Sequence, residues 1–60
     1  MTAEEWRKIW IATLVNNGIF LDTAEDAFNV CYGNQEVNTN VDPEYDASVF
    51  LPVFQTANKH

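Results

Sequence analysis

The stretch TAEEWRKIWIATLVNNG, residues 2–18, has the pattern of an amphipathic helix with a signal at each end. Thr2 and Glu5 have the spacing of a capping box, in which the Thr hydroxyl accepts from the Glu amide and the Glu side chain reaches back to the Thr amide. Gly18 can adopt the left-handed conformation with which many helices end. The sequence therefore predicts a helix that runs from this cap to Asn17.

The apolar face of this predicted helix is wider than the next helix alone can cover. At about 100° per residue, its apolar positions fall into two adjacent stripes that together occupy roughly two thirds of the circumference. The first stripe consists of Trp6, Ile9, Trp10 and Thr13, and the second of Ile11, Leu14 and Val15. We therefore expect two contact surfaces, one for the internal core and one for another chain.

A second helix is predicted after a short connection. Asp22 and Glu25 repeat the capping-box spacing, and Gly33 is a typical helix stop. One apolar stripe at i, i+3, i+4 and i+7 lies between them and consists of Ala24, Ala27, Phe28 and Cys31. Two helices joined this closely form an αα-hairpin.

A third element begins at Asp42 and Pro43, because Asp is a favoured cap and Pro suits the first helical position. We expect a short helix that ends before Pro52, with Leu51 extended, since the residue before a proline avoids the α conformation. Its inward side chains are predicted to be Tyr45, Val49 and Phe50. A strand over residues 48–54 is the alternative, because Val and Phe favour strands.

The length of 60 residues predicts a single small all-α domain of two or three helices, built on the hairpin. We assign residues 1–54 to this domain and residues 55–60 to a flexible C-terminal tail. A chain this short buries only about 60% of its unfolded surface, so it needs a disulfide, a metal or a partner chain. With one cysteine and one terminal histidine, the partner chain remains, and we expect self-association.

The net charge of −6 restricts the classes of partner. The basic side chains are Arg7, Lys8 and Lys59, too few to neutralise nucleic-acid phosphates or to bind an anionic membrane. A helix-turn-helix that binds DNA is disfavoured because its second helix would present Glu25 and Asp26 to the phosphates. An acidic mimic of nucleic acid, docked on a basic partner, is the main alternative to a hydrophobic interaction module.

The chain has no export signal or membrane-spanning apolar run, which predicts a cytoplasmic protein.

No residue pattern points to catalysis. Cys31 lacks a neighbouring histidine and falls on an apolar stripe, where a free cysteine packs as a small hydrophobe. The acidic residues Asp42, Glu44 and Asp46 lack the glycine that a calcium loop requires. We therefore expect neither an enzyme nor a cofactor or metal site.

The two tryptophans of the first helix lie one turn apart on the same face. They fit either a core pair or the anchors of an interface, in which Trp is enriched. The stem of Arg7 can cover apolar surface while its guanidinium pairs with a carboxylate of a partner. The candidate interface residues are Trp6, Arg7, Trp10, Ile11, Leu14 and Val15.

In layout, the chain resembles the short acidic helical proteins encoded in the early regions of tailed phages, lambdoid phages in particular. The resemblance rests on the start Thr2-Ala3-Glu4-Glu5-Trp6-Arg7, the Gly18 turn, the Ala24/Ala27 helix and the Asp42-Pro43 restart. It implies an accessory protein in the host cytoplasm that binds a host or phage protein. The predicted function is a small acidic protein–protein interaction module that acts as a homo-oligomer such as a homodimer.

Overall fold

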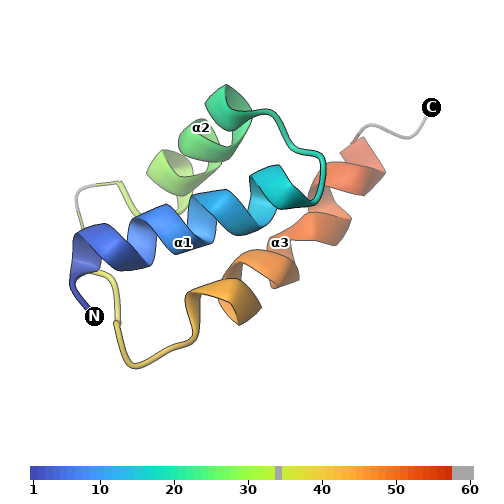
Figure 1. The fold of residues 1–60 in the computed structure, drawn as a ribbon. Coiled ribbons are helices and arrows are strands. Elements are labelled where there is room, and N and C mark those ends of the chain that lie inside the picture. Colours follow the sequence, from blue (N-terminus) through green and yellow to red (C-terminus); the bar gives the residue numbers. More distant parts are fainter. Residues whose placement is uncertain (34, 58–60) are drawn as a thin grey trace.

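The computed structural model describes residues 1–33 and 35–57, which form three helices (Figure 1). These are α1 (Ala3–Asn16), α2 (Leu21–Cys31) and α3 (Pro43–Ala57). The central helix is α1, which packs against both α2 and α3, whereas the backbones of α2 and α3 do not approach each other. The predicted all-α fold with its α1–α2 hairpin is confirmed.

Both ends of α1 lie close to the predicted positions, but the Glu5 side chain accepts from the Thr2 hydroxyl and not, as predicted, from the Thr2 amide. The Oγ1 atom of Thr2 accepts from the backbone N–H of Glu5 at 3.1 Å, and the Thr2 hydroxyl itself donates to the Glu5 carboxylate at 3.1 Å. At the other end, Gly18 has φ +95° and the N–H of Ile19 donates to the carbonyl of Leu14 at 3.1 Å. This bond pattern is a Schellman motif. It ends α1 at Asn16, one residue before the predicted end.

The start of α2 differs from the prediction. The carbonyl of Phe20 accepts from the N–H of Ala24 at 2.9 Å, so that the helix begins at Leu21 and Phe20 is its N-cap. No side chain caps this end, and Asp22 lies within the first turn. The predicted cap at Asp22 is therefore wrong, because the chain enters the helix directly after the Schellman turn.

The start of α3 agrees with the prediction, but its end does not. The carboxylate of Asp42 accepts from the N–H of Glu44 at 3.0 Å, and Pro43 is the first helical residue. The helix then continues through Pro52 to Ala57. An interior proline removes one backbone hydrogen bond and disfavours the helix locally. Here Phe50 and Leu51 pack against the core in the turn before the proline, which holds that turn helical.

The predictions of an extended Leu51 and of the alternative strand are thereby corrected. Leu51 is helical rather than extended, and residues 48–54 form no strand. The helix also includes residues 55–57 of the segment predicted to be a tail. Residues 58–60 of that segment lie outside the described residues.

The core lies between α1 and its two neighbours. Its buried residues are Trp6, Trp10, Ile11, Leu14, Ala24, Phe28 and Ala47. The ring of Trp10 contacts Phe28 of α2 and Phe50 of α3 edge-on, with centroids 5.4 and 5.6 Å apart. One indole therefore joins all three helices.

Two sequence predictions about core residues are wrong. On α3, Phe50 packs against the core as predicted, but Tyr45 and Val49 are 67% and 56% exposed, because the helix turns Ala47 toward α1 in their place. On α2, Cys31 is exposed. Tyr32 takes the inward position next to it, and its ring lies 5.6 Å from that of Trp6.

Candidate functional site

The structure places four of the six predicted interface residues in the core. Trp6 and Trp10 are 1% and 0% exposed, and Ile11 and Leu14 are also buried. The part of α1 that carries these four side chains is covered by α2 and α3 of the same chain. These four side chains are therefore not the exposed anchors that we predicted. The remaining two, Arg7 and Val15, reach the surface.

The polar atoms of both tryptophans are bonded within the chain. Nε1 of Trp6 donates to the carbonyl of Val41 at 2.8 Å, and Nε1 of Trp10 donates to Oδ2 of Asp46 at 2.9 Å. The hydroxyl of Tyr32 donates to the same Asp46 oxygen. Sequence reasoning missed this role of Asp46, because an acidic residue within a run of exposed acids gives no signal of an inward position.

This cluster does not activate a nucleophile. Desolvation raises the pKa of the Cys31 thiol, and the charge of Asp46 raises it further. Desolvation, together with the hydrogen bond to Asp46, also raises the pKa of Tyr32 far above its usual range. A reactive cysteine requires a lowered pKa. The hydrogen bonds of Trp10 and Tyr32 to Asp46 indicate a structural role for these three side chains.

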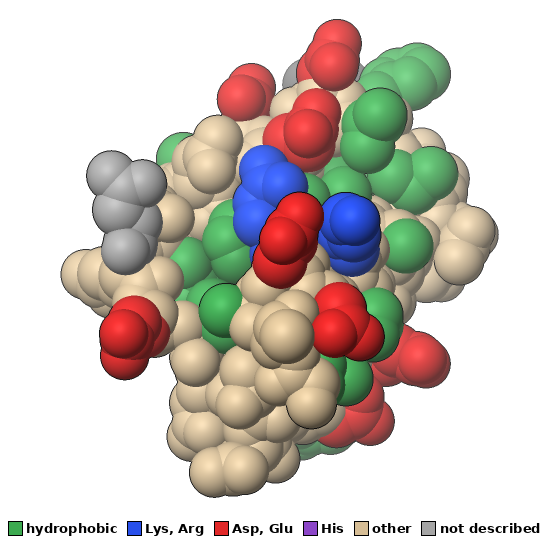
Figure 2. Space-filling view, turned by 60° about the vertical axis from the view of Figure 1, so that its left-hand side comes forward, with side chains coloured by type: hydrophobic (Ala, Val, Ile, Leu, Met, Phe, Trp, Pro, Cys, Tyr) green, Lys and Arg blue, Asp and Glu red, His purple; other side chains and the backbone are tan. Residues whose placement is uncertain are grey.

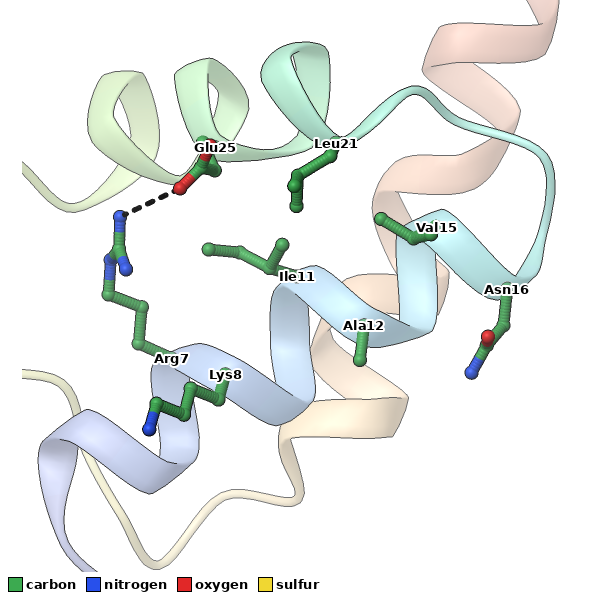
Figure 3. Close-up of a pocket in the computed structure, with 8 residues that line it drawn as sticks. All are labelled: Arg7, Lys8, Ile11, Ala12, Val15, Asn16, Leu21 and Glu25. Atoms are coloured by element: carbon green, nitrogen blue, oxygen red, sulfur yellow. Dashed lines mark ion pairs between the residues drawn. The ribbon is translucent and has the colours of Figure 1, made fainter.

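A surface groove lies between α1 and α2, with a volume of about 420 Å³ (Figure 3). We call it the α1–α2 groove. Its apolar lining comes from Ile11, Ala12 and Val15 of α1 and from Leu21 of α2, which is 55% exposed. Its polar lining consists of Arg7, Lys8, Asn16 and Glu25. Arg7 and Lys8 lie near one end of the groove, and Val15 and Asn16 lie near the other.

The basic end of the groove is positioned by contacts of Arg7. Its Nη2 atom lies 4.0 Å from Oε2 of Glu25, and its guanidinium carbon lies 5.4 Å from the centre of the Phe28 ring. The cation–π contact orients the guanidinium, whereas the exposed ion pair adds little stability. Lys8 is exposed and forms no ion pair with the described residues. Arg7 also lines a smaller hollow of about 240 Å³, with Phe28 and Val37.

The charges around the groove are distributed unevenly. Arg7 and Lys8 are the basic side chains of the described residues, and both line the groove. Figure 2 shows them near the middle of one face, with separate carboxylates around them and hydrophobic side chains beside them. The groove therefore combines exposed apolar area with positive charge on an acidic protein.

A second exposed apolar surface lies on α3. Tyr45, Val49 and Val53 are all more than half exposed and follow one another at i, i+4 and i+8. This spacing places them along one side of the helix. We call these three residues the α3 stripe. Asp42 and Glu44, both exposed, lie at its N-terminal end.

Comparison with known protein families, with curated proteins and with solved structures found no match to this chain. In the part of the chain that is described, no helix combines the length and the apolar character needed to span a membrane.

Proposed function

We propose that this chain is a small protein–protein interaction module and that the α1–α2 groove is its binding surface. The observation that carries the proposal is the exposed Leu21 and Val15 beside the two basic side chains of the described residues. Exposed apolar patches with a polar rim are typical of surfaces that bind other proteins.

The lining of the groove defines the chemistry of its partner. The apolar part fits one or two aliphatic or aromatic side chains of an amphipathic helix, a common ligand of such grooves. Lys8 and Arg7 favour a carboxylate at one end of that helix, because complementary charges orient a partner and speed its association. The expected partner segment is therefore an amphipathic helix that is acidic at one end.

The positions of the carboxylates favour this function over mimicry of nucleic acid. A mimic presents rows of negative charge in place of phosphates. Here Glu25 faces Arg7, and Asp46 accepts hydrogen bonds from core side chains. The carboxylates visible in Figure 2 stand apart around the two cations.

The test compares partner binding by the wild-type chain and by Leu21→Asp. Proteins captured from a cytoplasmic extract are identified, purified and titrated calorimetrically against both forms. Loss of the Leu21 contact is expected to weaken binding at least about tenfold, since burying a leucine stabilises by about 1.5–3 kcal/mol. Aspartate suits the first turn of α2, so the substitution is compatible with the helix.

Val30→Asp is the matched control, because Val30 is an exposed apolar residue of the same helix and does not line the groove. It is expected to bind the partner as the wild type does. A captured protein that binds Leu21→Asp as tightly as the wild type contradicts the assignment of the groove.

A further inference from the structure

We propose that the occupant of the α1–α2 groove is the α3 stripe of a second copy of this chain. The inference rests on the proposed function and names the partner of that same groove. The chain carries both halves of the contact: an apolar groove that is basic at one end, and an apolar helix side that is acidic at one end.

The order of charge and apolar residues agrees along the two surfaces. In the groove, Lys8 is followed along α1 by Ile11 and Val15. At the start of α3, the exposed Asp42 is followed at the same spacing by Tyr45 and Val49 of the α3 stripe. When the two helices run parallel, Asp42 of one copy lies beside Lys8 of the other, and the stripe follows the apolar lining.

The lengths of the two surfaces also agree. At 1.5 Å per residue, the path from Lys8 to Val15 along α1 covers about 10 Å. The path from Asp42 to Val49 along α3 spans the same number of residues and also covers about 10 Å. The apolar side chains of the stripe thus extend over the full apolar lining, while Lys8, which pairs with no described residue of its own chain, gains a carboxylate.

The electrostatics of the whole molecule favour this orientation. Two chains of net charge −6 repel each other unless opposite charges meet locally. The described basic side chains are both at the groove, and Arg7 already faces Glu25 there, so the exposed Lys8 is the charge that an acidic helix end of a second copy meets. The contact joins unlike surfaces, so that after two copies bind, one copy keeps a free stripe and the other a free groove.

Sedimentation equilibrium on the full chain tests the contact, over micromolar to millimolar concentration. The wild type is expected to self-associate. Leu21→Asp in the groove and Val49→Asp in the stripe are each expected to weaken association at least about tenfold. Val30→Asp is the control and is expected to associate as the wild type does. Circular dichroism of each variant verifies that it folds.

A mixture of the two variants tests whether each substitution removes only the contact between groove and stripe. Leu21→Asp keeps its α3 stripe and Val49→Asp keeps its groove, so a mixture regains association that neither variant has alone. The charged ends are tested by removing one charge at a time. Lys8→Gln and Asp42→Asn are each expected to weaken association at low salt and to have little effect at high salt, where the charges are screened. Asparagine at position 42 keeps a favoured helix cap.

Different experimental results contradict this inference and the proposed function. If the wild type stays monomeric at millimolar concentration while Leu21→Asp abolishes binding of a captured protein, the second copy is not the occupant and the groove keeps its function. If the chain self-associates but Leu21→Asp and Val49→Asp leave association unchanged, the proposed contact between copies is wrong. If the mixed variants fail to regain association, the pairing of groove and stripe is also wrong.

Discussion

Asp46 is the residue at which the three helices meet. It lies on α3 and accepts from Trp10 of α1 and from Tyr32, which directly follows α2. The same oxygen accepts both bonds, so one side chain fixes the rotation of α3 against the hairpin. No unpaired side-chain polar atom is buried among the described residues. Removing this acceptor therefore leaves two donors without a partner.

We expect Asp46→Ala to lower the free energy of unfolding by about 1–3 kcal/mol, the usual cost of leaving buried polar groups unsatisfied. Asp46→Asn keeps one oxygen acceptor and is expected to lose less. Urea unfolding followed by circular dichroism measures both values. An Asp46→Ala protein that unfolds at the wild-type urea concentration contradicts the role assigned to this carboxylate.

Tyr32 makes the stability of the fold sensitive to alkaline pH. Desolvation, the hydrogen bond to Asp46 and the negative charges of Asp46 and Cys31 raise its pKa in the folded protein. The unfolded chain releases the phenol proton near pH 10, whereas the folded chain retains it. The folded state then binds more protons, and the free energy of unfolding falls as pH rises above about 10.

We expect Tyr32→Phe to reduce this loss of stability with pH, because the substituted ring has no proton to release. Urea unfolding at a series of pH values between about 9 and 11 measures the slope. Tyr45→Phe, at an exposed tyrosine, is the control and is expected to keep the wild-type slope. Equal slopes in Tyr32→Phe and the wild type contradict the prediction.

Among the helix ends, the first turn of α2 is weakly stabilised, because no side chain caps it. Phe20 is its N-cap, makes no side-chain hydrogen bond and is exposed. A serine at this position can accept from a free N–H of the first turn. The protein thus carries an apolar residue where a polar cap gives a more stable helix.

Phe20→Ser is expected to raise the free energy of unfolding by about 0.5–2 kcal/mol through this capping bond. The measurement is the midpoint of urea unfolding. Val30→Ser makes a similar change at another exposed position of α2, away from the cap, and is expected to give no such gain. If both variants unfold at the same midpoint, Phe20 is not the position that limits this helix end.

The ends of the helices differ in how well local sequence predicts them. The cap at Thr2, the stop at Gly18 and the start at Asp42-Pro43 were predicted because they depend on residues within one turn. The course of α3 through Pro52 was not, because packing of Phe50 and Leu51 on the core outweighs the local preference of the proline. Tertiary contacts override propensity where the two conflict.

At the scale of the whole molecule, the two tryptophans distinguish a core formed by one chain from a core formed by two. Both indoles are buried and hydrogen-bonded within a single chain. Neither is among the lining residues of the α1–α2 groove. Self-association through the groove therefore leaves their surroundings unchanged.

We expect tryptophan fluorescence to have the short emission wavelength of buried indoles and to keep it when the protein is diluted from millimolar to micromolar concentration. Emission is expected to shift to longer wavelength only when urea unfolds the chain. A shift on dilution alone shows that the tryptophans contact a second chain, and contradicts the single-chain core.

The all-α class, the α1–α2 hairpin and most of the caps follow from the amino-acid sequence, because helical periodicity and capping act over a few residues. The sequence also indicates that α1 has more apolar surface than α2 alone can cover. Which surface covers the rest depends on the tertiary packing. Either α3 or a second chain could cover the remaining apolar face of α1, since hydrophobic burial is not directional. The hydrogen bond from Trp6 to the carbonyl of Val41, just before α3, holds α3 on α1, and the α1–α2 groove stays exposed.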